Sequence, residues 1–209
     1  MASGRQGLMV SLEAVDGAGK SSQVEAMARL LRAEGWEVVV TREPGGTPLA
    51  ESLRQAALSM PMDGLTETLL MFAARRDHIK QVIEPALKRG AVVICDRFTD
   101  STFAYQGGGR GFSWETLEQL EFWVQDGLQP DVTFWFDVSA KEAARRRGSA
   151  RSADRFEAED EAFFLRVIEG YERRAKQSPN RFVRLDASKD MGGVWADLER
   201  ELRAVLAGR

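Results

Sequence analysis

A glycine-rich turn near the N-terminus constrains the fold of this chain more than any other feature. Residues 8–13 form a short apolar run, LMVSLE, which predicts a buried strand. Residues 20–34 carry apolar side chains at helical spacing, and Gly35 ends the pattern. The turn between them reads EAVDGAGKSS over residues 13–22, and its Gly19-Lys20-Ser21 matches the end of the phosphate-binding P-loop pattern. A strand, a P-loop and a helix in succession predict an α/β protein that binds nucleotide phosphates at the carboxyl edge of a parallel sheet.

The turn departs from the P-loop pattern at its first glycine, where this chain has Ala14. A methyl group is tolerated there if the residue has a negative φ angle and no ligand atom crowds it. The remaining glycines allow backbone N–H groups to turn towards a phosphate, Lys20 can reach the β- and γ-phosphates, and the Ser21 hydroxyl can ligate Mg²⁺. The residues predicted to bind ATP are therefore Ala14, Val15, Asp16, Gly17, Ala18, Gly19, Lys20, Ser21 and Ser22.

Four more apolar runs predict the rest of the sheet, at residues 36–41, 91–96, 132–138 and 182–185. The three glycines at 107–109 predict a loop, and helical patterns lie at residues 49–58, 66–76, 79–88, 114–125, 160–176 and 193–206. Continuous apolar strands that alternate with helices are typical of a parallel sheet covered on both faces. The 209 residues contain no internal repeat and no linker, so we expect one α/β domain over residues 1–209.

Composition excludes several kinds of chemistry. One cysteine, Cys95, and one histidine, His78, rule out an intramolecular disulfide and a Cys/His zinc site, and we expect both side chains to be structural. The formal net charge of −3 disfavours a general nucleic-acid or membrane-surface binder, whose affinity comes from clustered positive charge. Residues 1–7 lack the apolar run of a secretory signal, and no stretch is long and apolar enough to span a membrane, so we expect a cytoplasmic protein.

The third predicted strand supplies a second part of a phosphoryl-transfer site. It ends at Asp96, whose carboxylate would project from the carboxyl edge of the sheet towards bound Mg²⁺, so Ser21 and Asp96 are the predicted metal ligands. Arg97 follows directly and would bring a cation to the same edge. In the alternative interpretation, Asp96 caps the next helix and Arg97 is merely exposed.

A nucleotide site of this kind suits a kinase, a GTPase switch or a motor ATPase. A GTPase normally reads guanine with an Asn-Lys-x-Asp segment, but the only asparagine here is Asn180, which precedes Arg181. The GTPase class is therefore disfavoured. A kinase needs an acceptor site and a mobile, cationic lid that excludes water. Five arginines lie between residues 145 and 155, and small residues separate several of them, which predicts such a lid.

Three further motifs point to a known family: Thr41 to Thr47 (TREPGGT), Asp96-Arg97-Phe98, and residues 104–110 (AYQGGGR). Together they resemble bacterial thymidylate kinases, and the resemblance runs from the P-loop to the C-terminal helix. It implies a P-loop nucleoside monophosphate kinase fold, transfer of the γ-phosphoryl group of ATP to dTMP with Mg²⁺, and a homodimer. Two other interpretations stay open. One is a kinase for another nucleoside monophosphate or a deoxynucleoside, and the other is a P-loop nucleotide-binding switch without kinase activity.

The resemblance also implies roles for the residues around the acceptor. Arg42 and Arg97 correspond to the arginines that hold the acceptor phosphate, and guanidinium groups suit such a bidentate contact. Asp16 corresponds to the acidic residue that approaches the 3′-hydroxyl of dTMP. Tyr105 would crowd a ribose 2′-hydroxyl. The positions that line the thymidine pocket match Ser101, Thr102, Tyr105 and Gln106.

The sequence offers two neighbouring positions for the arginine that contacts the base. Phe72 matches a phenylalanine that stacks on thymine, and the family has an arginine one helical turn later. Counting back from Val82-Ile83-Glu84-Pro85 selects Arg75, whereas counting four residues forward from Phe72 selects Arg76. Both arginines remain candidates, and Arg75 is slightly preferred.

The predicted lid covers about residues 145–157. Because Asp16 stands in the P-loop instead of an arginine, a lid arginine must neutralise the transferring phosphoryl group, which corresponds to the lid-arginine subtype of the family. The sequence does not rank the lid arginines. The catalytic candidates are Lys20, Arg97, Arg147, Arg151 and Arg155.

Overall fold

Parallel strands form a sheet at the centre of the molecule. In this computed structural model, which describes residues 6–147 and 155–208, the five strands are β1 (Leu8–Ala14), β2 (Val38–Arg42), β3 (Val92–Asp96), β4 (Val132–Asp137) and β5 (Phe182–Asp186). The strand order is β2-β3-β1-β4-β5, and every neighbouring pair is parallel. The predicted α/β architecture is therefore confirmed.

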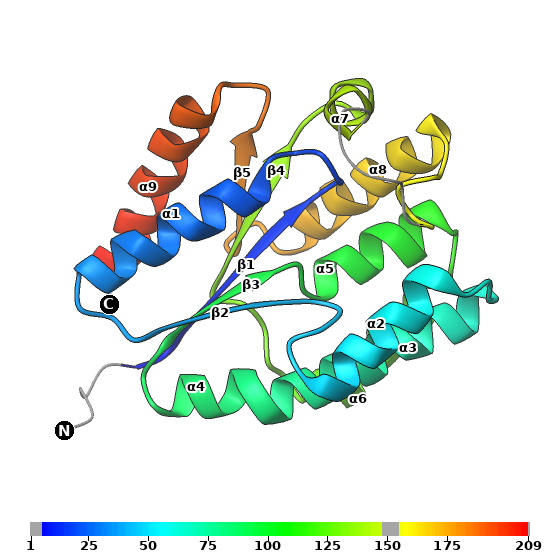
Figure 1. The fold of residues 1–209 in the computed structure, drawn as a ribbon, viewed down its shortest axis with the longest axis horizontal. Helices are drawn as coiled ribbons and strands as arrows, with labels where there is room; N and C mark the ends of the chain where they lie inside the picture. Colours follow the sequence, from blue (N-terminus) through cyan, green and yellow to red (C-terminus); the bar gives the residue numbers. More distant parts are fainter. Residues whose placement is uncertain (1–5, 148–154, 209) are drawn as a thin grey trace.

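Helices cover both faces of the sheet (Figure 1). α1 and α9 pack on one face, and α4 packs on the other together with the π-helical segment η1. No helix in the described parts of the chain is long and apolar enough to cross a membrane. The helical elements are α1 (Lys20–Ala33), α2 (Pro48–Ser59), α3 (Gly64–His78), η1 (Ile79–Ile83), α4 (Glu84–Lys88), α5 (Thr99–Thr102), η2 (Phe103–Gly109), α6 (Trp114–Gln125), α7 (Ala140–Arg147), α8 (Glu161–Gln177) and α9 (Met191–Ala207).

The strands send alternate side chains to the two faces of the sheet. Met9 of β1 and Cys95 of β3 pack against Ile79 of η1, whereas Leu8 and Val10 join the larger core that includes α1. The central strands are therefore buried on both faces. This is why runs of apolar residues, without polar alternation, predicted them correctly.

Two predictions about the helices are wrong in detail. Residues 66–76 and 79–88 belong to one continuous helical stretch, in which α3 is followed directly by η1 and α4. The glycines at 107–109 do not form a loop but end the π-helical segment η2. A Cβ atom at Gly108 would lie 2.4 Å from the carbonyl oxygen of Arg166, and one at Gly109 would lie 2.4 Å from the ring of Phe163. Gly108 and Gly109 therefore allow η2 to approach α8 closely because they have no side chain, and they do not serve to reverse the chain.

The carboxyl ends of three strands meet at one edge of the sheet. Asp96 at the end of β3 pairs in register with Leu12 of β1 and with Arg42 of β2. The turns that follow these strands therefore converge, and in open parallel sheets this edge is where ligands bind.

Candidate active site

The turn between β1 and α1 forms the predicted phosphate loop. Gly17 and Gly19 have φ angles of 91° and 86°, in the left-handed region that favours glycine. In the part of the chain that the structure describes, only Arg97 and Asp126 among the non-glycine residues share a positive φ. Ala14 is instead the buried last residue of β1, so its methyl group is accommodated there without backbone strain.

Lys20 and Asp96 face each other beside this loop. Lys20 begins α1, and its Nζ lies 3.4 Å from Oδ1 of Asp96. That carboxylate oxygen is buried, and no described residue donates a hydrogen bond to it. A buried acceptor without a donor, next to the Ser21 hydroxyl in one cleft, fits a hard cation such as Mg²⁺. The cleft is lined by residues 16–22, Arg42, Glu43, Arg54, Asp96, Arg97, Arg146 and Glu157.

Arg97 reaches from the edge of β3 to the phosphate loop. Its φ angle of 67° is unusual for a non-glycine residue. The guanidinium donates to the Ala14 carbonyl at 2.6 Å and to Asp16 Oδ1 at 2.7 Å. It also contacts the hydroxyl groups of Ser101, Tyr105 and Tyr171. Backbone strain that is held by so many partners is typical of functional positions.

Asp16 remains a carboxylate because of its neighbours. Burial by itself would raise its pKa, but the charges of Arg97 and Lys20 and a hydrogen bond from Tyr105 lower the pKa of Asp16 to about 2. Tyr105 donates that hydrogen bond to Oδ2 at 2.8 Å, and burial raises the pKa of the tyrosine itself. At neutral pH the phosphate loop therefore carries a carboxylate between two cations.

Glu13 is a buried acid that was not among the residues predicted for the site. Its Oε1 accepts a hydrogen bond from the backbone N–H of Phe98 at 2.8 Å, and its Oε2 accepts one from Ser101 at 2.5 Å. Burial, together with the charge of Asp100, raises the pKa of Glu13. The signal available in the sequence is a carboxyl group inside the largely apolar strand LMVSLEA, a costly place for an acid unless donors surround it.

A second cavity adjoins the phosphate-loop cleft. The two spaces share Asp16, Glu43, Arg54 and Arg97. The cavity brings together most of the residues that were predicted for the acceptor nucleotide. Its lining residues are Asp16, Glu43, Pro44, Arg54, Leu58, Met71, Arg75, Arg97, Phe98, Ser101, Thr102, Tyr105, Gln106 and Phe156.

Two arginines flank the junction between the cleft and the cavity. Arg42 ends β2 and lines the cleft, and its guanidinium pairs with Glu51 at 3.0 Å on the surface. Arg54 of α2 lines both spaces and donates to the Pro44 carbonyl at 3.1 Å. Arg54 was not predicted as a site residue. The sequence signal for it is the single arginine on the helix that directly follows the TREPGGT motif.

The predicted base-stacking residue lies outside the cavity lining, and this prediction needs correction. Phe72 is 2% exposed and packs with Phe103 and Leu117 in a separate core cluster. Met71 lies on the cavity wall instead. The reason is the direction of the side chains around α3. Met71 lies four residues before Arg75, on the same face of the helix, whereas the side chain of Phe72 is rotated from that of Met71 by about 100°.

Arg75 lines the cavity and Arg76 does not. Arg75 is buried, and it donates from Nε to Glu43 Oε2 at 2.7 Å and from Nη2 to Thr102 at 2.9 Å. Its Nη1 is also buried but has no hydrogen-bond partner among the described residues. Arg76 donates instead to the Val124 carbonyl of α6 at 2.9 Å. The two arginines between which the sequence did not decide therefore point in different directions from α3, Arg75 to the cavity and Arg76 to α6.

The arginine-rich segment is described only at its two ends. α7 ends at Arg147, and Arg151 lies outside the described residues. Arg146, which was not predicted, lines the phosphate-loop cleft and donates to the Ala187 carbonyl at 3.0 Å. The amino-terminal end of the segment therefore borders the cleft.

Arg155, at the other end of the segment, contacts α2 and α3. Its Nε donates to the Ala57 carbonyl at 3.1 Å, and its Nη2 pairs with the buried carboxylate of Glu67. The other oxygen of Glu67 accepts a hydrogen bond from Gln106 at 2.7 Å. Glu67 therefore connects this end of the segment to a residue of the cavity wall.

Comparisons with known proteins give the same picture as this geometry. Residues 12–197 match the family model described as "Thymidylate kinase". The chain is 57% identical to the thymidylate kinase of Verminephrobacter eiseniae over 207 residues, which cover 95% of this chain and 92% of that protein. It is 52% identical to the thymidylate kinase of Albidiferax ferrireducens over 207 residues, which cover 95% of this chain and 96% of that protein. The crystal structure of thymidylate kinase from Ehrlichia chaffeensis matches with a TM-score of 0.80 at 34% identity, over 95% of this chain and 99% of that chain, which confirms the predicted nucleoside monophosphate kinase fold.

Proposed function

This chain belongs to the thymidylate kinase family and phosphorylates dTMP to dTDP with ATP, and we propose that the two adjoining spaces divide the substrates between them. The cavity holds dTMP, and the phosphate-loop cleft holds the phosphates of ATP. One observation carries this assignment: Nη1 of Arg75 is a buried donor on the cavity wall without a hydrogen-bond partner among the described residues. Such a donor is costly until a ligand supplies an acceptor.

Three arginines suit the phosphate group of dTMP. Arg54 and Arg97 line both spaces, and Arg42 lines the cleft beside them. The pair between Arg42 and Glu51 is largely exposed, so it is weak and a phosphate can displace it. The ionised Asp16 lies next to Arg97 and accepts a hydrogen bond from the 3′-hydroxyl of the sugar. Together these groups would hold the acceptor oxygen in line with the γ-phosphate, which is the main requirement of phosphoryl transfer.

The base of dTMP would lie against the part of the cavity formed by α3 and η2. Arg75 donates from Nη1 to a carbonyl oxygen of thymine, and Gln106 and Thr102 line the same space. Met71, in place of the Phe72 that the sequence suggested, supplies an adaptable apolar surface for the ring. Ser101 and Tyr105, which also line the cavity, contact the sugar, where Tyr105 disfavours a 2′-hydroxyl.

The phosphate loop and the lid act on the transferring group. Lys20 and the N–H groups of residues 14–22 bind the ATP phosphates, and Ser21 and Asp96 would hold Mg²⁺, a role that is supported by Oδ1 of Asp96, which lies near Lys20 but accepts no hydrogen bond from a described residue. Bound Mg²⁺ neutralises charge on the phosphate oxygens. We assign the lid to residues 145–157 of a single domain over residues 1–209, and its arginines stabilise the same charge as Lys20 and Arg97. The lid candidates are Arg147, Arg151 and Arg155.

We further propose that the enzyme is a cytoplasmic homodimer that serves dTTP synthesis. Phe122 and Trp123 of α6 are neighbouring aromatic residues that are 74% and 69% exposed, which supports an interface on this helix. Analytical ultracentrifugation tests the dimer, and a monomer at micromolar concentrations would contradict it.

Calorimetric titration with dTMP tests the assignment of the cavity. Arg75→Lys keeps a cation beside Glu43 but removes the guanidinium fork, and we expect it to weaken dTMP binding about tenfold, or roughly 1.4 kcal/mol. Arg76→Lys is the matched control on the same helix, and its affinity should stay within about twofold of the wild type because Arg76 contacts α6. An unchanged affinity in Arg75→Lys, or equal losses in the two variants, would contradict the assignment.

A further inference from the structure

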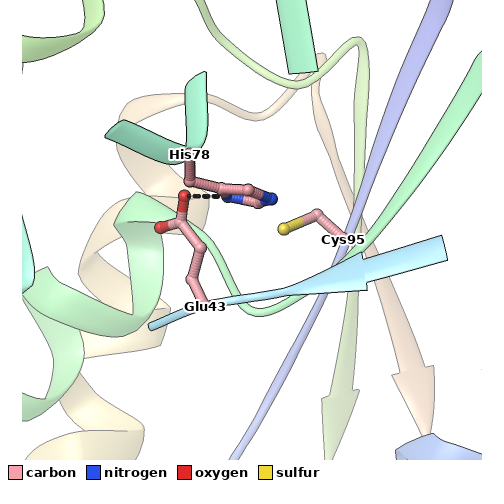
Figure 2. A group of neighbouring side chains, drawn as sticks. All are labelled: Glu43, His78 and Cys95. Carbon is pink, nitrogen blue, oxygen red and sulfur yellow. Dashed lines mark hydrogen bonds and ion pairs between the residues drawn. The ribbon is translucent and has the colours of Figure 1, made fainter. Parts of the chain in front are cut away.

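Glu43, His78 and Cys95 form a buried group next to the cavity (Figure 2). Their potential ligand atoms lie within 4.8 Å of one another, an arrangement that could suit a metal ion. However, both oxygens of Glu43 and both ring nitrogens of His78 already have protein partners. Cys95 Sγ donates to the Arg97 carbonyl at 2.9 Å, and burial raises the pKa of this thiol, so it is not the thiolate that binds metals. The group is therefore better described as a hydrogen-bond network.

The network extends from β2 to the arginine on the cavity wall. Nε2 of His78 lies 2.6 Å from the Thr41 hydroxyl, and Nδ1 of His78 lies 2.9 Å from Oε1 of Glu43. The other carboxylate oxygen, Oε2, accepts a hydrogen bond from Nε of Arg75 at 2.7 Å. Because a carboxylate only accepts, Nδ1 carries a proton, and Nε2 is then available to accept from Thr41.

Burial and packing leave these side chains little freedom. His78 is fully buried, and Glu43 and Arg75 are each 3% exposed. A Cβ atom at Gly46 would lie 2.6 Å from the His78 ring, so the TREPGGT turn closes directly against the imidazole. A buried carboxylate that loses one donor bears a large desolvation cost. Loss of the Nδ1 donor would therefore favour rotation of Glu43, and rotation would release Nε of Arg75.

We propose that His78 is a positioning residue for the acceptor nucleotide. Through Glu43, it fixes the guanidinium of Arg75 in the orientation that presents Nη1 to the cavity. His78 itself does not line the cavity, so its effect on the substrate passes through Glu43 and Arg75, and we expect it on the binding of dTMP. The proposal rests on the assignment of Arg75 to the base of dTMP.

Two amide substitutions of His78 test the roles of Nδ1 and Nε2 separately. The side-chain nitrogen of asparagine lies near the position of Nδ1, and that of glutamine lies near the position of Nε2. His78→Asn therefore keeps a donor for Glu43, whereas His78→Gln keeps only a group that faces Thr41. We expect His78→Gln to raise the KM for dTMP about tenfold while kcat and the KM for ATP stay within about twofold. The lost contact binds dTMP equally in the ground state and the transition state, so its loss changes KM and not kcat. His78→Asn should keep the KM for dTMP within about threefold of the wild type.

A double-mutant cycle shows whether the effect passes through Arg75. In an Arg75→Lys background, His78→Gln should change the KM for dTMP by less than about twofold, because the contact that it supports is already lost. A fully additive rise, or equal rises in the asparagine and glutamine variants, would overturn the proposal, since either would mean that only the packing of the ring matters. An unchanged KM in Arg75→Lys alone would instead overturn the assignment of Arg75, so the two failures are distinguishable.

Thr41→Val tests the other end of the network if His78→Gln does not fold. The substitution removes the hydroxyl that orients Nε2 but keeps a β-branched side chain in β2. We expect a rise of about threefold in the KM for dTMP, with kcat unchanged. An unchanged KM for dTMP in this variant would count against the proposal.

Discussion

Arg97 adopts a backbone conformation that arginine rarely takes, and its neighbours explain how it is maintained. The φ angle of 67° directs the guanidinium to the Ala14 carbonyl and to Asp16. Glu13 holds the next residue by accepting a hydrogen bond from the Phe98 N–H at 2.8 Å. The strained backbone, the buried acid and the ion pair therefore stabilise one another, and they position a cation at the junction of the phosphate-loop cleft and the cavity.

Asp16 gives a prediction with a defined dependence on pH. Its folded-state pKa of about 2 lies below the ordinary value of 3.8, so the ionised group stabilises the fold above about pH 4, and this contribution is lost as the pH falls towards 2. Asp16→Asn should lower the free energy of unfolding by about 2 kcal/mol at pH 7, and the difference should narrow to about half near pH 3. Denaturant unfolding of both proteins across this range measures it. A difference that stays constant with pH would show that the ion pair with Arg97 is not its source.

The sequence did not predict which of two neighbouring residues on α3 lines the cavity. Spacing alone allowed both Arg75 and Arg76, because residues three and four positions after Phe72 both lie near it on a helix. Which arginine lines the cavity depends on the rotation of α3 against α6 and η2, and packing between distant segments sets that rotation. The same rotation directs Phe72 into the core and Met71 to the cavity.

At the level of elements, η2 contributes Tyr105 and Gln106 to the cavity wall and packs against α8. Gly108→Ala would place a methyl group 2.4 Å from the Arg166 carbonyl oxygen, and the two helices would have to separate. We expect a loss of about 1–3 kcal/mol in the free energy of unfolding. Gly64→Ala at the start of α3 is the control, because its Cβ would lie 3.8 Å from the nearest atom, on Phe112. Thermal and denaturant unfolding compare the variants, and equal stability of Gly108→Ala and the wild type would contradict this role of the glycines.

The strands were predictable because the information is local. β1, β3 and β4 are short apolar runs, as burial on both faces of a parallel sheet requires, whereas the edge strands β2 and β5 are only partly buried. The π-helical segment η2 was not predictable in this way, because Gly107 to Gly109 are equally compatible with a loop. The approach of α8, which lies far along the chain, explains Gly108 and Gly109, and the packing of Trp114 and Leu117 of α6 explains Gly107.

At the level of the whole molecule, the wall of the cavity depends on contacts between distant parts of the chain. Arg155 pairs with Glu67, and Glu67 also accepts a hydrogen bond from Gln106, so the end of the predicted lid and the cavity wall share one buried carboxylate. The sequence suggested the lid from its run of arginines, but it contained no signal that pairs Arg155 with Glu67. The turn of the phosphate loop, in contrast, was predictable from the sequence, because its residues are consecutive and connect the end of β1 at Ala14 to the start of α1 at Lys20.

The acceptor specificity of phosphoryl transfer tests the central claim most directly. Initial rates with MgATP should be measured for dTMP, dUMP, dCMP and dGMP, with Lys20→Ala as the inactive control. We predict that dTMP has the highest kcat/KM, because Arg75 and the cavity around it recognise thymine, and that Lys20→Ala abolishes turnover with every acceptor. A higher kcat/KM for any other nucleotide, or undiminished turnover in Lys20→Ala, would contradict the account.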